Sequence, residues 1–293
     1  MQKTSRIAIA LFALASLAAV AGPTGESAAG ADTKAGVVDN PVLRVCADPY
    51  QLPFSDRDGQ GYENKIAELF ARKLGAKLQY TWFPQRMAFI RNTLTAENDD
   101  GTFKCDLILS MPSGVDMVAT TRPYYTSTWM LAYVRGRGLD DVQVADDLGR
   151  VVEAGRKVKF GMTDQGPATT WAFRRGLMAN MEPYIGMPAD PAVDPNEERI
   201  RDLVDGKIDA TTIWGPAGGY LREKYKGKAD LVLLPLPDDP DNAENRFTYS
   251  VSMAVRHADK DLKKRIQTLI DENRDEITAI LKSYGIPLVE EPK

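Results

Sequence analysis

The sequence predicts an α/β protein of two lobes, each built on a doubly wound, mixed or parallel sheet, with two hinge crossings between them. Apolar strand-like runs alternate with amphipathic helical stretches over residues 43–110, and the same alternation returns over 158–234. Two β-rich segments, 129–134 and 247–255, bracket the second stretch. Alternation of this kind is typical of parallel sheets with helices on both faces.

In the first lobe the elements are expected in the order strand, helix, strand, helix, strand. The first helix is indicated by Ile66, Leu69, Phe70 and Leu74, which form one stripe at i, i+3, i+4 and i+8, and by Gly75 in a C-cap position. The expected elements are a strand at 43–46, this helix, a strand at 77–83, a helix marked by Met87, Ile90 and Leu94, and a strand at 106–110.

The second lobe is expected to repeat this plan. Asp194 and Pro195 occupy N-cap and N1 positions, with Glu197 and Glu198 in the first helical turn. The expected elements are a strand at 158–162, a helix at 168–178, the helix after Asp194, a strand at 208–214, a helix opened by Pro216 and a short strand at 231–234. One amphipathic helix, 262–284, is then expected to pack back on the first lobe.

The N-terminus has the pattern of a secretory signal peptide. Lys3 and Arg6 precede the apolar run 7–20, which is shorter than a membrane span, and small residues follow at 19–21. A buried N-terminal helix is the alternative. The predicted organisation is a signal peptide at 1–21, a flexible leader at 22–40, a first lobe at 41–133 plus 253–293, and a second lobe at 134–252.

Charge and cysteine content narrow the partners and the compartment. The net charge is -4, and loss of the signal peptide would leave about -6, which argues against nucleic acid and anionic membranes as partners. In an oxidising compartment Cys46 and Cys105 are expected to form a disulfide, with two buried thiols as the alternative. Closing that loop would stabilise the fold by roughly 4 kcal/mol in the chain-entropy model.

The residue inventory argues against an enzyme. His257 is the only histidine, and the sequence has no Gly-x-Ser-x-Gly turn and no glycine-rich phosphate loop. The acidic stretch 237–241 lacks the spacing of an EF-hand loop. We therefore expect no catalytic residues, no metal and no cofactor. A dehydratase using Asp116 or Asp164 is the least favoured alternative.

Several motifs resemble the type II periplasmic solute-binding proteins. They are LRVCADP (43–49), GYENKIAELFARKL (61–74), CDLI (105–108), RPYY (122–125) and GKIDATTIWGP (206–216). Together with TWFPQRMAFIRNTL (81–94), they look like the MxaJ/XoxJ-type subfamily, whose members accompany periplasmic quinoprotein methanol dehydrogenases. The resemblance implies a periplasmic accessory protein that binds a PQQ-dependent methanol dehydrogenase, with a c-type cytochrome of the same system as a further partner.

The cleft implied by this resemblance lacks the charged clamps of its amino-acid-binding members. Those proteins hold the ligand carboxylate with an Arg and the ammonium with an acidic residue, and the matching positions here are Gly114 and Trp214. An amino-acid zwitterion would lose water there without gaining partners. We therefore expect a neutral or apolar ligand, or a segment of a partner protein.

Loops beyond the carboxyl ends of the strands should line this cleft. Several expected cleft positions have an alternative interpretation. Phe54 and Tyr125 could be core residues, and Arg122 could form a surface ion pair. The segment 161–169 could be an ordinary helix start. The alternative function is a receptor that delivers a small neutral or weakly polar solute to an ABC transporter. The expected cleft residues are Tyr50, Phe54, Ser110, Met111, Pro112, Gly114, Arg122, Tyr125, Thr163, Gly166, Thr169, Trp214 and Gly215.

Overall fold

The computed structural model describes residues 42–163, 166, 168–238 and 246–290. The expected signal peptide and leader lie outside these residues, as does Asp164. Within the described ranges no helix is both long enough and apolar enough to cross a membrane.

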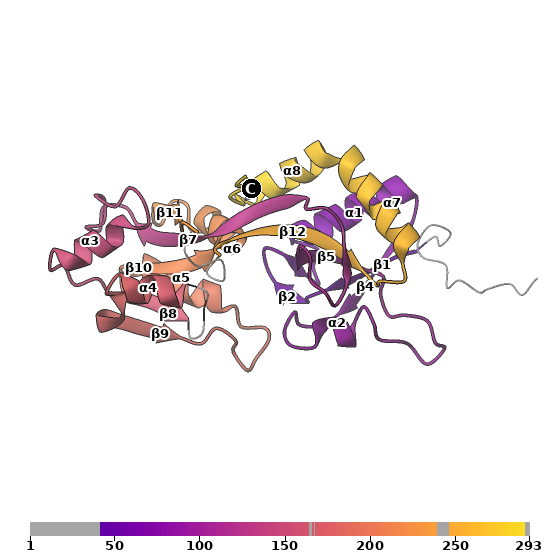
Figure 1. The fold of residues 1–293 in the computed structure, drawn as a ribbon, viewed down its shortest axis with the longest axis horizontal. Coiled ribbons are helices and arrows are strands. Elements are labelled where there is room, and N and C mark those ends of the chain that lie inside the picture. The colour runs from indigo at the N-terminus through magenta and orange to yellow at the C-terminus, as the bar shows by residue number, and fades with distance from the viewer. Residues whose placement is uncertain (1–41, 164–165, 167, 239–245, 291–293) are drawn as a thin grey trace, which may run out of the picture. The chain divides into compact units, whose positions relative to one another are not determined.

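Strands and helices alternate along most of the described chain (Figure 1). The strands are β1 (Val42–Ala47), β2 (Tyr50–Gln51), β3 (Ser55–Asp56), β4 (Lys77–Trp82), β5 (Leu107–Pro112), β6 (Ala119–Thr120), β7 (Tyr125–Val134), β8 (Phe160–Thr163), β9 (Met181–Tyr184), β10 (Ala210–Trp214), β11 (Leu231–Pro235) and β12 (Thr248–Val255). The helices are α1 (Tyr62–Leu74), α2 (Phe89–Asn92), α3 (Asp147–Glu153), α4 (Thr169–Arg174), the 3₁₀ helix η1 (Leu177–Asn180), α5 (Pro195–Val204), α6 (Gly215–Lys224), α7 (Lys260–Glu272) and α8 (Arg274–Ser283).

The same strand order occurs twice. In the first lobe β1 lies between β4 and β5 and is parallel to both. In the second lobe β8 lies between β9 and β10 and is again parallel to both. Each lobe thus has the 2-1-3 order of a doubly wound sheet, with antiparallel strands added at β12 and β7. The predicted fold class is confirmed.

Side chains of alternate residues in the strands are buried on opposite faces of each sheet. In β5, Leu107 and Leu109 pack with α1, α7 and α8, whereas Ile108 packs with Phe89 of α2 on the other face. In the second lobe the residues of β7 divide in the same way between a cluster with α3 and α4 and a cluster with α5 and α6. Burial on both faces explains why these strands read as continuous apolar runs.

Two long strands, β7 and β12, connect the two groups of strands, and they run beside each other in Figure 1. They pair antiparallel from Tyr125 opposite Val251 to Thr128 opposite Thr248. The second half of β7 then pairs with β10 and β11. These strands correspond to the two expected crossings, while the lobe boundaries at 133/134 and 252/253 stay a prediction.

The C-terminal region forms two helices, so the expectation of one continuous helix was wrong. Asn273 has φ -120° and separates α7 from α8, and its Nδ2 donates to the Leu269 carbonyl at 2.8 Å. An asparagine side chain that bonds nearby backbone competes with the helical pattern. The apolar faces of both helices pack in the first-lobe core with α1, as expected.

Two other expected helices are shorter in the structure. The helix marked by Met87, Ile90 and Leu94 is the single turn α2, because Ala88 at its N-cap has φ 67°. The helix expected at 168–178 ends at Arg174 and continues after Gly176 as η1.

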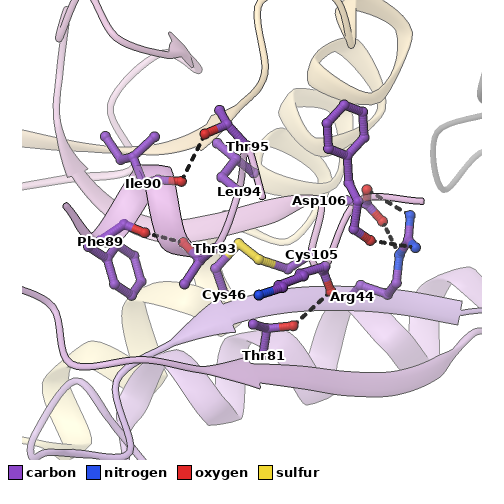
Figure 2. Close-up of a disulfide and its surroundings, with 12 residues drawn as sticks. Arg44, Cys46, Thr81, Phe89, Ile90, Thr93, Leu94, Thr95, Cys105 and Asp106 are labelled. Atoms are coloured by element: carbon purple, nitrogen blue, oxygen red, sulfur yellow. Dashed lines mark hydrogen bonds and ion pairs between the residues drawn. A yellow bond between two sulfur atoms is a disulfide. The ribbon is translucent and has the colours of Figure 1, made fainter. Parts of the chain in front are cut away.

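The predicted disulfide between Cys46 and Cys105 is confirmed, with a Cα–Cα distance of 5.4 Å (Figure 2). It joins β1 to the residue two before β5. Asp106, buried beside it, pairs with Arg44 at 2.7 Å and with Arg256 at 2.6 Å. The covalent link and the buried ion pairs together attach the 95–105 loop to the sheet.

Candidate functional site

A cavity of about 370 Å³ lies beyond the carboxyl ends of β5 and β10, beside the crossing strands β7 and β12. This is the edge at which open α/β sheets bind ligands. None of the described residues that line the cavity carries a charged side chain. Its lining residues are Gln51, Phe54, Gln85, Ser110, Met111, Pro112, Tyr125, Trp129, Trp214, Tyr249 and Val251.

Aromatic side chains from three adjacent strands form one wall of this cavity. Trp214 of β10 lies opposite Trp129 of β7 in the antiparallel register, and their ring centroids are 6.3 Å apart at 51°. The Tyr249 ring of β12 lies 5.9 Å from Trp214 at 72°. These inclined contacts are favourable for aromatic pairs and hold the wall together.

A network of buried hydroxyl groups lies behind Ser110. The Ser110 Oγ is 3.2 Å from the Tyr62 hydroxyl and 3.1 Å from the Tyr124 hydroxyl. The Tyr62 and Tyr125 hydroxyls are 2.8 Å apart. Burial raises the pKa of all three tyrosines, so these groups stay neutral and serve as hydrogen-bond partners.

Two acidic side chains lie next to this network. Burial raises the pKa of Glu63 to about 7, and the Ser110 hydroxyl lowers it in part. The Asp48 carboxylate, only 7% exposed, accepts the backbone N–H of Tyr50 at 2.8 Å and of Gln85 at 2.5 Å. Neither side chain lines the cavity itself, but each contacts or neighbours residues that do.

The structure brings six of the expected cleft residues to this cavity. They come from the loop after β2, from the end of β5, from the start of β7 and from the end of β10. They are Phe54, Ser110, Met111, Pro112, Tyr125 and Trp214.

Tyr50 and Arg122 lie elsewhere. Tyr50 is 46% exposed and lines a separate hollow with Asp56 and Glu197. The Arg122 guanidinium pairs with Asp271 of α7 at 2.5 Å on the surface, because the residues after β6 pack against that helix. The surface pair was the alternative considered for Arg122, and the expectation of a cleft position is corrected.

Five further expected residues do not line the cavity. Gly114 is exposed in a turn with φ +79°, and the glycine is required there because side chains rarely adopt this backbone conformation. Thr163, Gly166 and Thr169 gather at the start of α4, where the Thr169 hydroxyl donates to the Gly166 carbonyl at 2.7 Å. Gly215 packs on β7, where a Cβ would lie 2.6 Å from Ser127 Oγ.

Some lining residues were not expected from the sequence: Gln51, Gln85, Trp129, Tyr249 and Val251. The sequence feature that could have pointed to them is the alternation of side chains between the two faces of the crossing strands. Trp129 belongs to a segment assigned as a crossing strand, and Tyr249 and Val251 share one face of the other crossing. Their convergence depends on how β7, β10 and β12 pair, which the local pattern does not specify.

The described residues contain no group of three or more His, Cys, Asp or Glu side chains placed to hold a metal ion. In the acidic stretch after β11, Asp238 accepts the backbone N–H groups of Phe247 and Thr248 at 2.6 and 3.0 Å. Its carboxylate therefore links the residues after β11 to the start of β12.

Most of the chain is similar to several known proteins. No family model matches the chain. Protein MoxJ of Methylorubrum extorquens is 28% identical over 290 residues, which cover 96% of this chain and 92% of that protein. The crystal structure of periplasmic binding protein XoxJ from Methylobacterium extorquens AM1 is 31% identical with a TM-score of 0.65, covering 85% of this chain and 100% of that one.

More distant structures share the fold alone. MxaJ from Methlophaga aminisulfidivorans MPT is 22% identical with a TM-score of 0.67, covering 84% of this chain and all of that one. An ancestral amino-acid-binding protein, described as a precursor of cyclohexadienyl dehydratase, is 17% identical with a TM-score of 0.56, covering 84% of this chain and 96% of that one.

Proposed function

Because the chain belongs to the MxaJ/XoxJ family of periplasmic binding proteins, we propose that it is a periplasmic accessory protein of a PQQ-dependent methanol dehydrogenase. It binds the dehydrogenase and assists its assembly, activation or cofactor loading. A c-type cytochrome of the same system is a further proposed partner. The chain itself carries out no catalysis.

The observation that supports this proposal is the lining of the cavity. Of the eleven lining residues in the described part of the chain, five are aromatic and none is charged. Amino-acid receptors need charged groups in their clefts to replace the water lost by the ligand's own charges. An aromatic wall suits an apolar or weakly polar segment of a partner protein, because aromatic residues supply large buried area at interfaces.

The proposal predicts that Trp214 contributes strongly to capture of the dehydrogenase. Trp214→Ala removes the ring that packs on both Trp129 and Tyr249, and anchors of this kind are worth about 2 kcal/mol or more, or roughly 30-fold in affinity. The measurement is recovery of methanol dehydrogenase on the immobilised mature chain from periplasmic extract, followed by an activation assay.

Two controls accompany this measurement. Trp82→Ala removes a tryptophan that stacks on Tyr80 outside the cavity and should leave capture unchanged. Trp214→Phe keeps a ring and should retain part of the affinity. Equal dehydrogenase recovery by wild type and Trp214→Ala, with both proteins folded by circular dichroism, would show that the cavity is not the binding surface.

The second candidate is a transport receptor for a small neutral or weakly polar solute. The cavity volume of about 370 Å³ favours it, since sites for small molecules fall in this size range. Calorimetry of the mature protein against neutral metabolites separates the two functions. Submicromolar solute binding together with no recovered dehydrogenase would support transport instead.

A further inference from the structure

The cavity presents aromatic faces and no basic side chain. Phe54, Tyr125, Trp129, Trp214 and Tyr249 line it, and among the described lining residues Gln51, Gln85 and Ser110 add polar side chains to the tyrosine hydroxyls and the indole N–H groups. The face of an aromatic ring carries negative potential and attracts a cation placed over it, most strongly for tryptophan. Among the lining residues within the described ranges, no arginine or lysine offsets this potential.

Two acidic groups lie next to polar residues of the lining, Asp48 beside Gln85 and Glu63 beside Ser110. Asp48 is held by the backbone N–H groups of Tyr50 and Gln85, and Gln85 lines the cavity. Glu63 is buried behind Ser110, and its Oε1 has no hydrogen-bond partner within the described part of the chain. Arg86, which follows Gln85 in the sequence, donates to the carbonyls of Pro188 and Asp190.

We propose that this cavity binds an alkylated ammonium group. Such a group combines apolar surface, which the aromatic wall removes from water, with a positive charge that the ring faces and the nearby Asp48 carboxylate stabilise. A neutral group would use only the apolar part of the site. An anionic group would meet no arginine or lysine and would be repelled.

The ammonium group has two possible sources, a lysine side chain of the partner protein or a small methylated amine. The first source rests on the proposed function. Both sources present a cation attached to apolar alkyl groups, but the lysine ammonium carries N–H donors and a fully methylated amine carries none. Calorimetric or NMR titration with choline and with n-butylammonium distinguishes them. Tighter binding of choline indicates the small amine, and tighter binding of n-butylammonium indicates the lysine side chain.

The decisive comparison uses a neutral isostere. The compound 3,3-dimethylbutan-1-ol has the shape and hydroxyl group of choline without the charge. We expect choline to bind about 3- to 30-fold more tightly than this alcohol. Equal affinity, or tighter binding of the alcohol, would overturn the proposal.

The variant Trp214→Leu keeps an apolar side chain at the cavity but removes the ring. It should lower the affinity for choline by about 3-fold or more and leave the alcohol's affinity nearly unchanged, which also demonstrates that the cavity is still formed. Trp82→Leu is the matched control outside the cavity and should change neither. Equal weakening of both probes would contradict the inference.

The outcome is separable from that of the proposed function. Preference for choline over the alcohol without capture of dehydrogenase would retain this inference and reject the accessory role. Capture of dehydrogenase through Trp214 without such a preference would retain the accessory role and reject the ammonium ligand.

Discussion

Glu63 is an acidic residue buried in the first turn of α1, and its carboxyl belongs to the core of the first lobe. A helix N-terminus favours a negative charge, which would lower the pKa of this carboxyl. Burial has the opposite effect and prevails, since the pKa rises from 4.5 to about 7. At the residue scale the carboxyl is thus neutral over much of the mildly acidic range.

This pKa predicts that the protein loses stability as the pH rises. Between the unfolded value of 4.5 and the folded value of about 7 the folded state holds the extra proton, so the free energy of unfolding is highest below this window and falls through it. Glu63→Gln should remove that fall, which is at most about 3 kcal/mol. Urea denaturation at about pH 5 and about pH 8 measures it.

The control for this experiment is Glu68→Gln on the same helix. Glu68 is partly exposed and pairs with Lys65, so its removal should leave the pH dependence in place. If the stability of Glu63→Gln followed pH as steeply as the wild type, another group would be responsible.

At the element scale, the segment after α8 joins the C-terminal helices to the crossing strand β7 and to α6 of the second lobe. The Val289 backbone N–H donates to the Thr126 carbonyl at 3.0 Å, and the Ser127 hydroxyl donates to the Pro287 carbonyl at 2.6 Å. Gly219 of α6 and Gly285 then approach so closely that a Cβ on Gly219 would lie 2.0 Å from the Gly285 oxygen. Both glycines are required by this backbone contact.

We predict that Gly219→Ala destabilises the protein even though alanine is the better helix former. The clash is with backbone atoms and should cost about 1–3 kcal/mol, which outweighs a gain of about 1 kcal/mol in helix propensity. Gly149→Ala in α3 is the matched control, since its Cβ would lie no closer than 3.1 Å to the Arg175 side chain and 3.8 Å to that residue's Cα. Equal midpoints of urea denaturation for both variants would mean that the backbones at Gly219 and Gly285 do not approach this closely.

On the scale of the whole molecule, the 84–86 segment connects the cavity to a loop of the second lobe. Gln85 lines the cavity and donates to the Ser110 carbonyl at 3.2 Å. Its neighbour Arg86 donates to the carbonyls of Pro188 and Asp190 at 2.5 and 3.4 Å. The segment 84–86 therefore contacts both the cavity, through Gln85, and the 185–193 loop, through Arg86.

Removing this connection should free the loop. Arg86→Ala is expected to speed amide hydrogen exchange in residues 185–193 by about 2- to 12-fold, the equivalent of one hydrogen bond worth about 0.5–1.5 kcal/mol. Arg91→Ala, at an exposed position in α2, is the control and should leave exchange unchanged. Unaltered exchange in the Arg86 variant would show that the loop is held by other contacts.

Much of the fold could be predicted because it depends on local patterns. Helical stripes such as Ile66, Leu69 and Phe70, and the capped start at Asp194, are encoded in neighbouring residues and appear as α1 and α5. Helix length was harder to predict: α7 and α8 share one apolar period, yet Asn273 divides them through its own bond to the backbone.

The sequence by itself determined the alternation that builds the two doubly wound sheets and indicated the pairing of Cys46 with Cys105, because periodicity and residue identity carry that information. The lack of charged clamps at Gly114 and Trp214 is what the family resemblance implies. Only the tertiary structure decided which side chains meet. Trp129 and Tyr249 reach Trp214 through the antiparallel registers of β7, β10 and β12, while Arg122 turns to α7. Strand pairing between distant segments sets these positions, and no local pattern specifies it.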